Sequence, residues 1–317
     1  MAKKAKLPQA VTLIREHATR KVDYSTEKSI SYSQATNYLG CPFRWHLVYR
    51  ENKQVYQPSI HTVFGTAFHE TVQNWLTVLY EDSVKAANEI NLHEYLQNKL
   101  TEIYKQELDK VDFNHFSTAE QLAEFYEDGC AILDYLQKNR AGYFSTKGWY
   151  LVGCEIPLSL PVVEGYEKVI FKGYLDLVMY HEPTNTYEII DIKTSTKGWG
   201  VKEKGDELKA MQLLLYKEYF AKQFGVDKSS VKVKFLIVRR KAGENPYTGG
   251  KLSRVQEFIP PTGPKKTKAA LEIVELFVTS CFTKGGQFFP KDHPKNISND
   301  SCRWCPFRDN ASCGMKK

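Results

Sequence analysis

The chain has 317 residues, 42% of them hydrophobic and 13% aromatic, so it can bury a substantial core and is too long for a minimal single-sheet domain. No apolar run approaches the length of a membrane span, and no internal repeat or low-complexity segment is present, which excludes spanning helices and repeat arrays. The net charge of +7 is unevenly placed: residues 1–191 carry 19 Lys and Arg against 25 Asp and Glu, whereas residues 192–317 carry 25 against 12. A half that basic predicts a polyanionic partner.

The N-terminal half is predicted to be mainly helical. Three lysines among residues 1–6 are followed by no apolar stretch, so a solvated, mobile end is expected rather than a targeting sequence. A helix begun by Ser33 is expected to reach about residue 50, and a capping box at Ser117-Thr118-Ala119-Glu120 predicts another helix start. The expected helices are 33–50, 64–80, 92–109 and 118–139.

The second half is predicted to alternate between strands and helices. Strands are expected near 149–160, 168–181, 186–193 and 231–240, with helices over 206–224 and 264–281. The Gly- and Lys-rich stretch 194–205 is expected to be a loop able to touch a phosphate backbone, and 243–250 a loop between strands. Four parts are predicted to fold as one unit: an extension 1–30, a helical portion 31–145, an α/β core 146–260 and a helix with a cysteine tail 261–317.

The segments 173–178 and 187–193 flank a turn-rich stretch and read as a hairpin that carries charged residues. Asp176 lies on the first strand, and Asp191 and Lys193 share one face of the second because side chains alternate along a strand. A solvated hairpin is the alternative, but nearly continuous apolar runs around the acids predict strands buried on both faces. Buried carboxylates need compensation, which a divalent cation can provide. The pattern indicates metal-dependent phosphodiester hydrolysis, with the lysine facing the reacting phosphate or water.

This arrangement resembles the PD-(D/E)XK nuclease superfamily, which has an Asp on one strand and acid-x-Lys on the next. Gly173-Tyr174-Leu175-Asp176 replaces the literal Pro-Asp, as in the branch that includes RecB-type nuclease domains. The resemblance implies an α/β, restriction-endonuclease-like fold, with a mixed sheet core flanked by helices. It also implies that Mg²⁺ or Mn²⁺ is held by His69, Asp176, Asp191 and the Ile192 carbonyl.

Three further segments fit the same superfamily in its order. Gly65 to His69 resembles its G-x-x-x-H element, whose His is a metal ligand; a surface or core histidine is the alternative. Glu155 matches an acidic position before the first Asp and is expected to be a ligand or a general base, with an exposed strand glutamate as the alternative. Gln212 and Tyr216 match a Q-x-x-x-Y motif, whose spacing puts both on one helix face, where they would hold the substrate backbone.

The seven cysteines give a second signal. The count is odd and no secretory signal is seen, so a reducing cytoplasm is expected rather than disulfides. The resemblance extends to iron-sulfur nucleases such as the AddB nuclease domain, CRISPR adaptation nucleases and exonuclease V. It implies a 4Fe-4S cluster, with structural zinc left open by the spacing, held by Cys41, Cys302, Cys305 and Cys313.

Such a cluster would be a clasp between the two ends of the chain, with a structural role. Trp304 and Phe307 are expected to cover it rather than to stack on bases. The remaining thiols are expected to be buried hydrophobes: Cys130, Cys154 and Cys281. Of the basic runs, Arg239-Arg240-Lys241 is the stronger candidate for a polyanion contact, and 265–268 is expected to be a solvated helix start.

The resemblance implies a metal-dependent deoxyribonuclease, a RecB-like exonuclease acting on DNA ends or single strands in recombination, repair or replication. No helicase signature is present, so unwinding would come from a helicase or recombination protein, and no membrane association is expected. A non-catalytic, nucleic-acid-binding iron-sulfur scaffold in a recombination or CRISPR adaptation complex is one alternative, which the retained His, two Asp and Lys oppose. RNA or a DNA junction as substrate is another.

Overall fold

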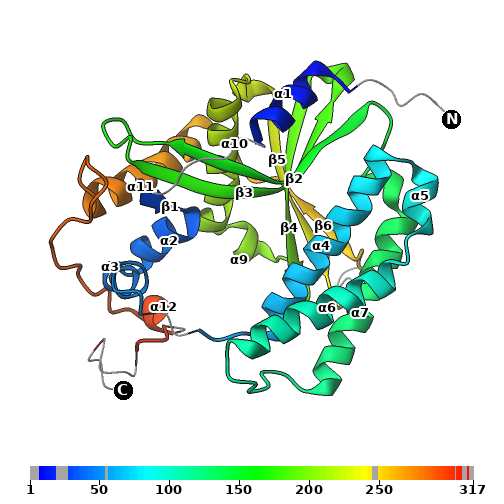
Figure 1. The fold of residues 1–317 in the computed structure, drawn as a ribbon, viewed down its shortest axis with the longest axis horizontal. Coiled ribbons are helices and arrows are strands. Elements are labelled where there is room, and N and C mark those ends of the chain that lie inside the picture. The colour runs from blue at the N-terminus through cyan, green and yellow to red at the C-terminus, as the bar shows by residue number, and fades with distance from the viewer. Residues whose placement is uncertain are drawn as a thin grey trace.

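A mixed sheet runs through the centre of the computed structural model, with helices on both faces (Figure 1). The structure describes residues 7–18, 28–53, 56–244, 249–303, 305–308 and 313. Within them the sheet has six strands: β1 Lys28–Ile30, β2 Trp149–Pro161, β3 Val169–His181, β4 Thr186–Ser195, β5 Val231–Arg239 and β6 Val255–Phe258.

Strand β3 organises the sheet because both of its edges are paired. β2 runs antiparallel along one edge, and the other edge is shared by parallel β1 at Val169–Phe171 and antiparallel β4 at Leu177–His181. β4 continues the sheet to parallel β5, which pairs with antiparallel β6. Residues 172–176 of β3 therefore join neither the β1 ladder nor the β4 ladder, and Asp176 lies in that interval.

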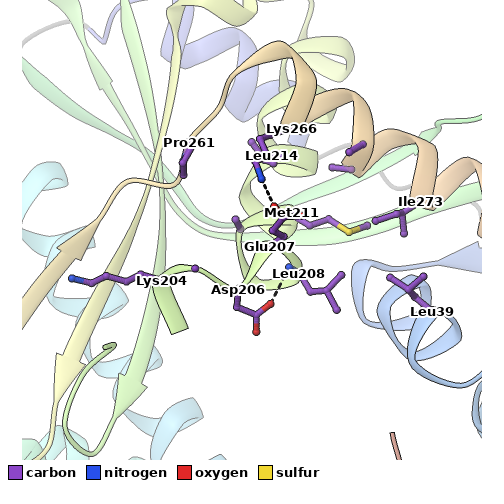
Figure 2. Close-up of a pocket in the computed structure, with 14 residues that line it drawn as sticks. Leu39, Lys204, Asp206, Glu207, Leu208, Met211, Leu214, Pro261, Lys266 and Ile273 are labelled. Carbon is purple, nitrogen blue, oxygen red and sulfur yellow. Dashed lines mark hydrogen bonds and ion pairs between the residues drawn. The ribbon is translucent and has the colours of Figure 1, made fainter. Parts of the chain in front are cut away.

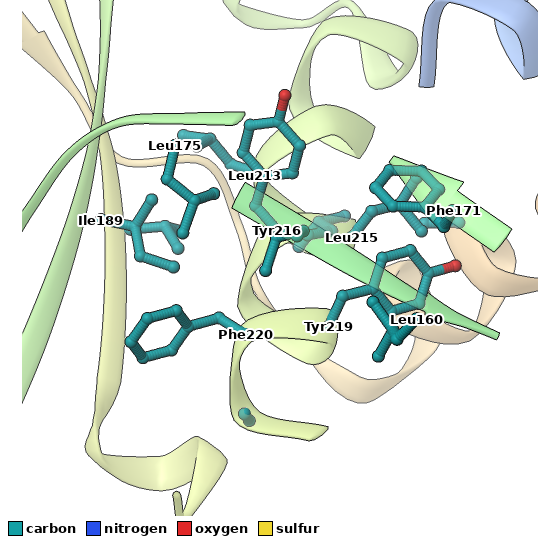
Figure 3. Close-up of a cluster of buried hydrophobic side chains, with 14 of the residues drawn as sticks. Leu160, Phe171, Leu175, Ile189, Leu213, Leu215, Tyr216, Tyr219 and Phe220 are labelled. Atoms are coloured by element: carbon teal, nitrogen blue, oxygen red, sulfur yellow. The ribbon is translucent and has the colours of Figure 1, made fainter. Parts of the chain in front are cut away.

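One face of the sheet is covered by helices from both ends of the chain. Figure 3 shows how Leu213, Tyr216 and Phe220 project from a helix toward Leu175 and Ile189 of the sheet. Burial of such side chains supplies most of the free energy that holds the layer in place. The layer consists of α1 Gln9–Ala18, α2 Tyr32–Gly40, α3 Pro42–Trp45, a π-helical turn His46–Arg50, α10 Glu207–Phe224 and α11 Pro264–Cys281.

The opposite face is covered by a helical group from the N-terminal half. Its central helix begins with a capping box in which Ser59 and Thr62 satisfy each other's main-chain N–H groups. Gly129 lets two helices approach closely, because a Cβ at this position would lie 2.5 Å from Leu96 Cδ2. The group comprises α4 Ile60–Glu81, α5 Val84–Glu89, α6 Leu92–Asp109, α7 Ala119–Lys138 and α8 Arg140–Tyr143.

Short elements complete the described chain. A left-handed Asn185 closes the turn between β3 and β4, a conformation that Asn tolerates well. The remaining elements are two 3₁₀ turns at Glu182–Thr184 and Lys228–Ser230, α9 Val201–Lys204 and α12 Asn299–Cys302. No helix among the described residues has both the length and the hydrophobicity needed to cross a bilayer.

The predicted α/β class, a mixed sheet flanked by helices, is confirmed, and the predicted helices 92–109 and 264–281 have the bounds of α6 and α11. The single helix predicted over 33–50 is wrong. The observed helix, α2, is capped by Ser31 rather than Ser33 and ends before Pro42. Proline disfavours a helical conformation at the residue before it, and Cys41 is extended. The capping box of α7 uses Thr118 and Gln121 rather than Ser117 and Glu120.

Among the described residues, seven helices and strands were not predicted: α1, α5, α8, α9, α12, β1 and β6. Two of them, α1 and β1, lie within the predicted extension 1–30 and pack on the sheet, with Arg15 of α1 donating to the main-chain oxygens of Leu151 and Val152. The prediction of a loop over 194–205 is wrong for residues 201–204, which form α9. The solvated end predicted for residues 1–6 lies outside the described residues.

Candidate functional site

Three side chains from three elements converge beside the unpaired interval of β3. His69 comes from α4, Glu155 from β2 and Asp176 from β3, and one possible ligand atom from each lies within 4.8 Å of the other two. His69 Nδ1 and Asp176 Oδ2 are 3.6 Å apart. An imidazole nitrogen and two carboxylates at this separation form a donor set suited to a divalent cation.

The register of β2 and β3 brings Glu155 and Asp176 together. Cys154 pairs with Leu177 and Ile156 with Leu175, so Glu155 stands opposite Asp176. Glu155 is the one strand residue here with a left-handed backbone, at φ +50°. Such a conformation in a non-glycine residue is strained, and strained residues often occur at functional sites.

The side chain of Asp176 also holds the next strand. Its Oδ2 accepts a hydrogen bond from the main-chain N–H of Ile192 at 2.8 Å, beyond the last β3–β4 pair, Leu177 with Ile190. Burial raises the pKa of Asp176, with the Ile192 N–H and the charge of Lys193 acting in the opposite direction. The carboxyl therefore fixes the position from which Asp191 and Lys193 extend.

Asp191 and Lys193 form an ion pair on the shared face of β4. Lys193 Nζ lies 2.7 Å from Asp191 Oδ1, and the side chain of Asp191 is 2% exposed whereas that of Lys193 is 34% exposed. The ammonium of Lys193 is thus the partner of this buried oxygen. Burial raises the pKa of Asp191, the Lys193 charge opposes that rise, and the Asp176 charge adds to it. A bound cation would further offset the negative charge of the two buried carboxylates.

His69 is held in the form that a metal ligand needs. Burial lowers the pKa of its imidazole, with the nearby charge of Asp191 acting in the opposite direction. The ring is therefore neutral at neutral pH and keeps a nitrogen lone pair available.

Gln212 and Tyr216 share one face of α10, and Gln212 Nε2 donates to the Tyr216 hydroxyl at 3.1 Å. The Tyr216 ring packs against Gly173 of β3, where a Cβ would lie only 3.0 Å from Tyr216 Cε1. Burial raises the pKa of Tyr216 to about 12, and the charges of Asp191 and Asp176 add to the rise. The phenol thus stays protonated as a potential donor beside the carboxylates.

Gln73 is a site residue that the sequence interpretation missed. It lies four residues after His69 on α4, and its Nε2 is 2.6 Å from Glu155 Oε1 and 3.1 Å from the main-chain oxygen of Asp176. The i, i+4 spacing to His69 was the available signal.

The four cysteines assigned to a cluster line one cavity at the junction of the α2–α3 corner with the C-terminal segment. Lining residues with a positive charge are Arg44, Lys295 and Arg308, and the main-chain N–H of Asn296 lies 3.5 Å from Cys41 Sγ. Phe307 is 2% exposed and lines the same cavity, whereas Trp304 lies outside the described residues. The four thiols are Cys41, Cys302, Cys305 and Cys313.

All seven cysteines are free thiols in the described part of the chain. Cys281 is buried, as predicted, but Cys130 and Cys154 are only partly buried, so the prediction for them is wrong in degree. Cys130 on α7 and Cys154 on β2 pack against the edge of the buried cluster rather than at its centre.

The predicted polyanion contact at Arg239-Arg240-Lys241 is wrong for Arg240. This residue is 6% exposed, donates to Asp128 Oδ2 at 2.8 Å, and stacks 3.6 Å above the centre of the Phe125 ring. Its guanidinium therefore joins the end of β5 to α7 and does not face solvent. Lys241 pairs with Asp128 and Glu124 but its side chain is 47% exposed.

A groove of about 480 Å³ opens elsewhere, between α2, the start of α10 and α11 (Figure 2). Its walls are mainly aliphatic, with Leu39, Met211 and Ile273 facing it. Asp206 is occupied as the N-cap of α10, and Lys266 pairs with Glu207. The groove therefore offers no donor set comparable to that of His69, Glu155 and Asp176.

Comparison with protein-family models gives a match to the PD-(D/E)XK nuclease superfamily over residues 29–310. Comparison with curated proteins gave no significant match. The matched span includes β2 to β6, β1 from its second residue, and every site residue except Cys313.

Proposed function

Because the chain belongs to the PD-(D/E)XK nuclease superfamily, whose members are typically metal-dependent nucleases, we propose that it is a RecB-like exonuclease that hydrolyses DNA. Its mixed sheet flanked by helices is consistent with the restriction-endonuclease-like fold of that superfamily.

The observation that carries the proposal is the convergence of His69, Glu155 and Asp176 beside the buried pair of Asp191 and Lys193. The donor set fits a divalent cation, and the buried carboxylate of Asp191 is near enough to Asp176 for the two charges to interact. Mg²⁺ or Mn²⁺ would be held by His69, Asp176, Asp191 and the Ile192 carbonyl, with Glu155 as a further ligand or as the general base.

These residues would hold a divalent ion that, when bound, would supply Lewis acidity to the attacking water and positive charge to the phosphate. Lys193 is half-buried and adjacent to Asp191, so its ammonium can orient the water and stabilise the charge that develops on the phosphate. Gln212 and Tyr216 supply an amide and a phenol to the substrate backbone.

A nucleic acid as substrate is supported by the basic C-terminal part of the chain and by the loop after Lys193. Lys197 on this loop and Lys202 on the short helix α9 that follows it are exposed. Their position next to the catalytic strand suits contacts to phosphate groups, which supply most of the sequence-independent affinity for nucleic acids. A helicase or recombination protein would supply any unwinding.

The cysteine cavity supports a 4Fe-4S cluster, with zinc as the alternative. Four thiols that the chain draws from both ends line one cavity, which is the number that such a cluster requires. The N–H of Asn296 facing Cys41 Sγ suits a thiolate, and Arg44, Lys295 and Arg308 would offset its charge. The role assigned to the cluster is structural: it clasps the C-terminal segment to α2 and α3.

Digestion of end-labelled DNA tests the proposal. Single- and double-stranded DNA with free and blocked ends, and RNA of the same sequence, are incubated with the protein in Mg²⁺, in Mn²⁺ and in chelator. Stepwise loss from free DNA ends, abolished by chelator, supports an exonuclease. Equal cleavage of blocked ends contradicts the exonuclease, and absence of cleavage of every substrate contradicts the nuclease.

A further inference from the structure

We propose that Gln73 is a positioning residue that fixes the carboxylate of Glu155 at the metal site, so that it sets metal affinity without touching the metal or the substrate. The inference rests on the proposed function and assigns a role to a residue outside the motifs of the sequence. It starts from the bond geometry of one side chain.

Gln73 is 8% exposed and is committed to two acceptors. Its Nε2 donates to Glu155 Oε1 at 2.6 Å and to the main-chain oxygen of Asp176 at 3.1 Å. Because both partners only accept hydrogen bonds, the amide nitrogen rather than the amide oxygen must face them. Both of its N–H groups are thereby used, and the amide connects the two carboxylate-bearing strands.

The place of Gln73 on α4 makes this connection specific to the site. His69 and Gln73 are four residues apart and lie on the same face of the helix. α4 therefore delivers a donor atom with His69 and the support for a second donor with Gln73. A small shift of α4 would displace both together.

Glu155 needs such support. Its left-handed backbone is sparsely populated by non-glycine residues, and its side chain faces the carboxylate of Asp176. A neutral amide holds Glu155 without adding charge, whereas Lys or Arg at this position would compete with a cation for the carboxylate. Losing the hydrogen-bond partner of a metal ligand typically lowers metal affinity by about 10- to 100-fold.

A purely structural role for Gln73 can be distinguished, because the chain contains a matched glutamine. Gln223 of α10 also bridges to β2: its Nε2 donates to the Pro157 oxygen at 2.9 Å and its Oε1 accepts from the Ser159 N–H at 2.7 Å. It contacts main chain only and no carboxylate. Gln223→Met therefore removes a similar bridge on the same strand without touching the site.

The test is calorimetric titration of the purified full-length protein with Mn²⁺. Gln73→Met keeps the side-chain volume and removes the amide, and we expect its Kd to rise about 10-fold, with DNA cleavage reduced at limiting Mn²⁺ and restored at saturating Mn²⁺. Gln223→Met should lower the melting temperature and leave the Kd unchanged. In a Glu155→Gln background, Gln73→Met should cause no further loss of affinity, because the two residues act as one unit.

If Gln73→Met leaves the Kd within two-fold of wild type while lowering the melting temperature as Gln223→Met does, Gln73 is structural and the inference is wrong. Should Gln73→Met fail to fold, Gln73→Asn keeps the amide but shortens its reach, and the same loss of affinity is expected. Wild-type protein that binds no Mn²⁺ and cleaves nothing contradicts the proposed function as well, whereas active wild type with an unaffected Gln73→Met contradicts this inference alone.

Discussion

The main-chain N–H of Ile192 donates to Asp176 Oδ2 across 2.8 Å, at the point where β3 and β4 have ceased to pair. One carboxylate oxygen thus holds the second strand and also faces His69. Substituting Asp176 would change both the backbone geometry and the donor set. Asp191 and Lys193 give a cleaner test of the chemistry, because their contact is a side-chain pair.

We expect Asp191→Asn and Lys193→Met each to reduce DNA cleavage by at least about 10²-fold. Asp191→Asn keeps the shape of the side chain and removes a carboxylate whose pKa is raised by burial, so its melting temperature in chelator at neutral pH should equal or exceed that of wild type. Single-turnover cleavage assays and thermal unfolding measure the two effects. Lys85→Met, at a highly exposed position on α5, is the control. Activity within a few-fold of wild type for both site variants would show that the proposed site is wrong.

His69→Ala should weaken metal binding and reduce cleavage, with partial recovery at high Mn²⁺. Wild-type affinity should also fall as the pH is lowered, because burial raises the pKa of Asp176 and Asp191 and the cation must then displace protons. Titration calorimetry across pH values measures both effects. His93→Ala on α6, whose imidazole pairs with Asp134 at the surface, should change neither, and metal binding by His69→Ala equal to wild type returns His69 to a structural role.

Protein purified without oxygen should be brown, with broad visible absorption, acid-labile sulfide and about four irons per chain. Cys305→Ser should lower the melting temperature and the solubility, because the clasp joins distant parts of the chain. DNA cleavage at the β3–β4 site should be less affected than stability.

Cys130→Ser is the control for the cluster, since Cys130 lies on α7 away from the cysteine cavity. Colourless protein with stoichiometric zinc would show that the four thiolates bind zinc and not an iron-sulfur cluster. Full metal content and wild-type melting of Cys305→Ser would show that the tail cysteines are ordinary thiols.

The burial of His293 predicts that the free energy of unfolding of the protein falls in mild acid. It is 4% exposed, packs edge-on against Trp45, and its pKa is lowered to about 4, first by burial and then by the positive charges of His46 and Lys291. The unfolded chain, with an ordinary histidine pKa of about 6.5, binds the proton more tightly, so stability falls as the pH drops from about 6.5 toward 4.

Urea unfolding of wild type and His293→Gln at pH 7.5, 6.0 and 5.0 measures this effect. The variant should lose less stability than wild type between the first and last of these pH values. Equal losses in the two proteins would contradict the assignment, because the other titrating groups are common to both.

The strands and most helices could be predicted because their periodicity is local. β3 and β4 are long, apolar and separated by a turn with Asn185, and the hairpin followed from these features. The break at Pro42 was also readable, since proline disfavours helix at the preceding residue. β1 was not, because three residues carry no period and this strand exists only through its pairing with Val169–Phe171.

The site could be predicted in part for the same reason. The motif residues follow one another with fixed spacing, but the left-handed backbone of Glu155 depends on packing that its neighbours in the chain do not encode. The burial of Arg240 was hidden in the same way, since its partner Asp128 lies 112 residues earlier. Gln73 could have been predicted, because its i, i+4 spacing to His69 is the same as the spacing that placed Gln212 and Tyr216 on one helix face.

The union of the α2–α3 corner with the C-terminal segment has a consequence for synthesis of the protein. Asn296 meets Cys41 across 255 residues of sequence, and the fully buried Trp45 packs on Phe277, Phe282 and Phe288. At about 5–20 residues per second, a ribosome needs about 13–50 s to make the intervening chain. During that time Trp45 can pack only on nearby rings such as Tyr38 and Tyr49, because Phe277, Phe282 and Phe288 have not yet been made. The α2–α3 corner is therefore among the last parts of the molecule to acquire its full set of contacts.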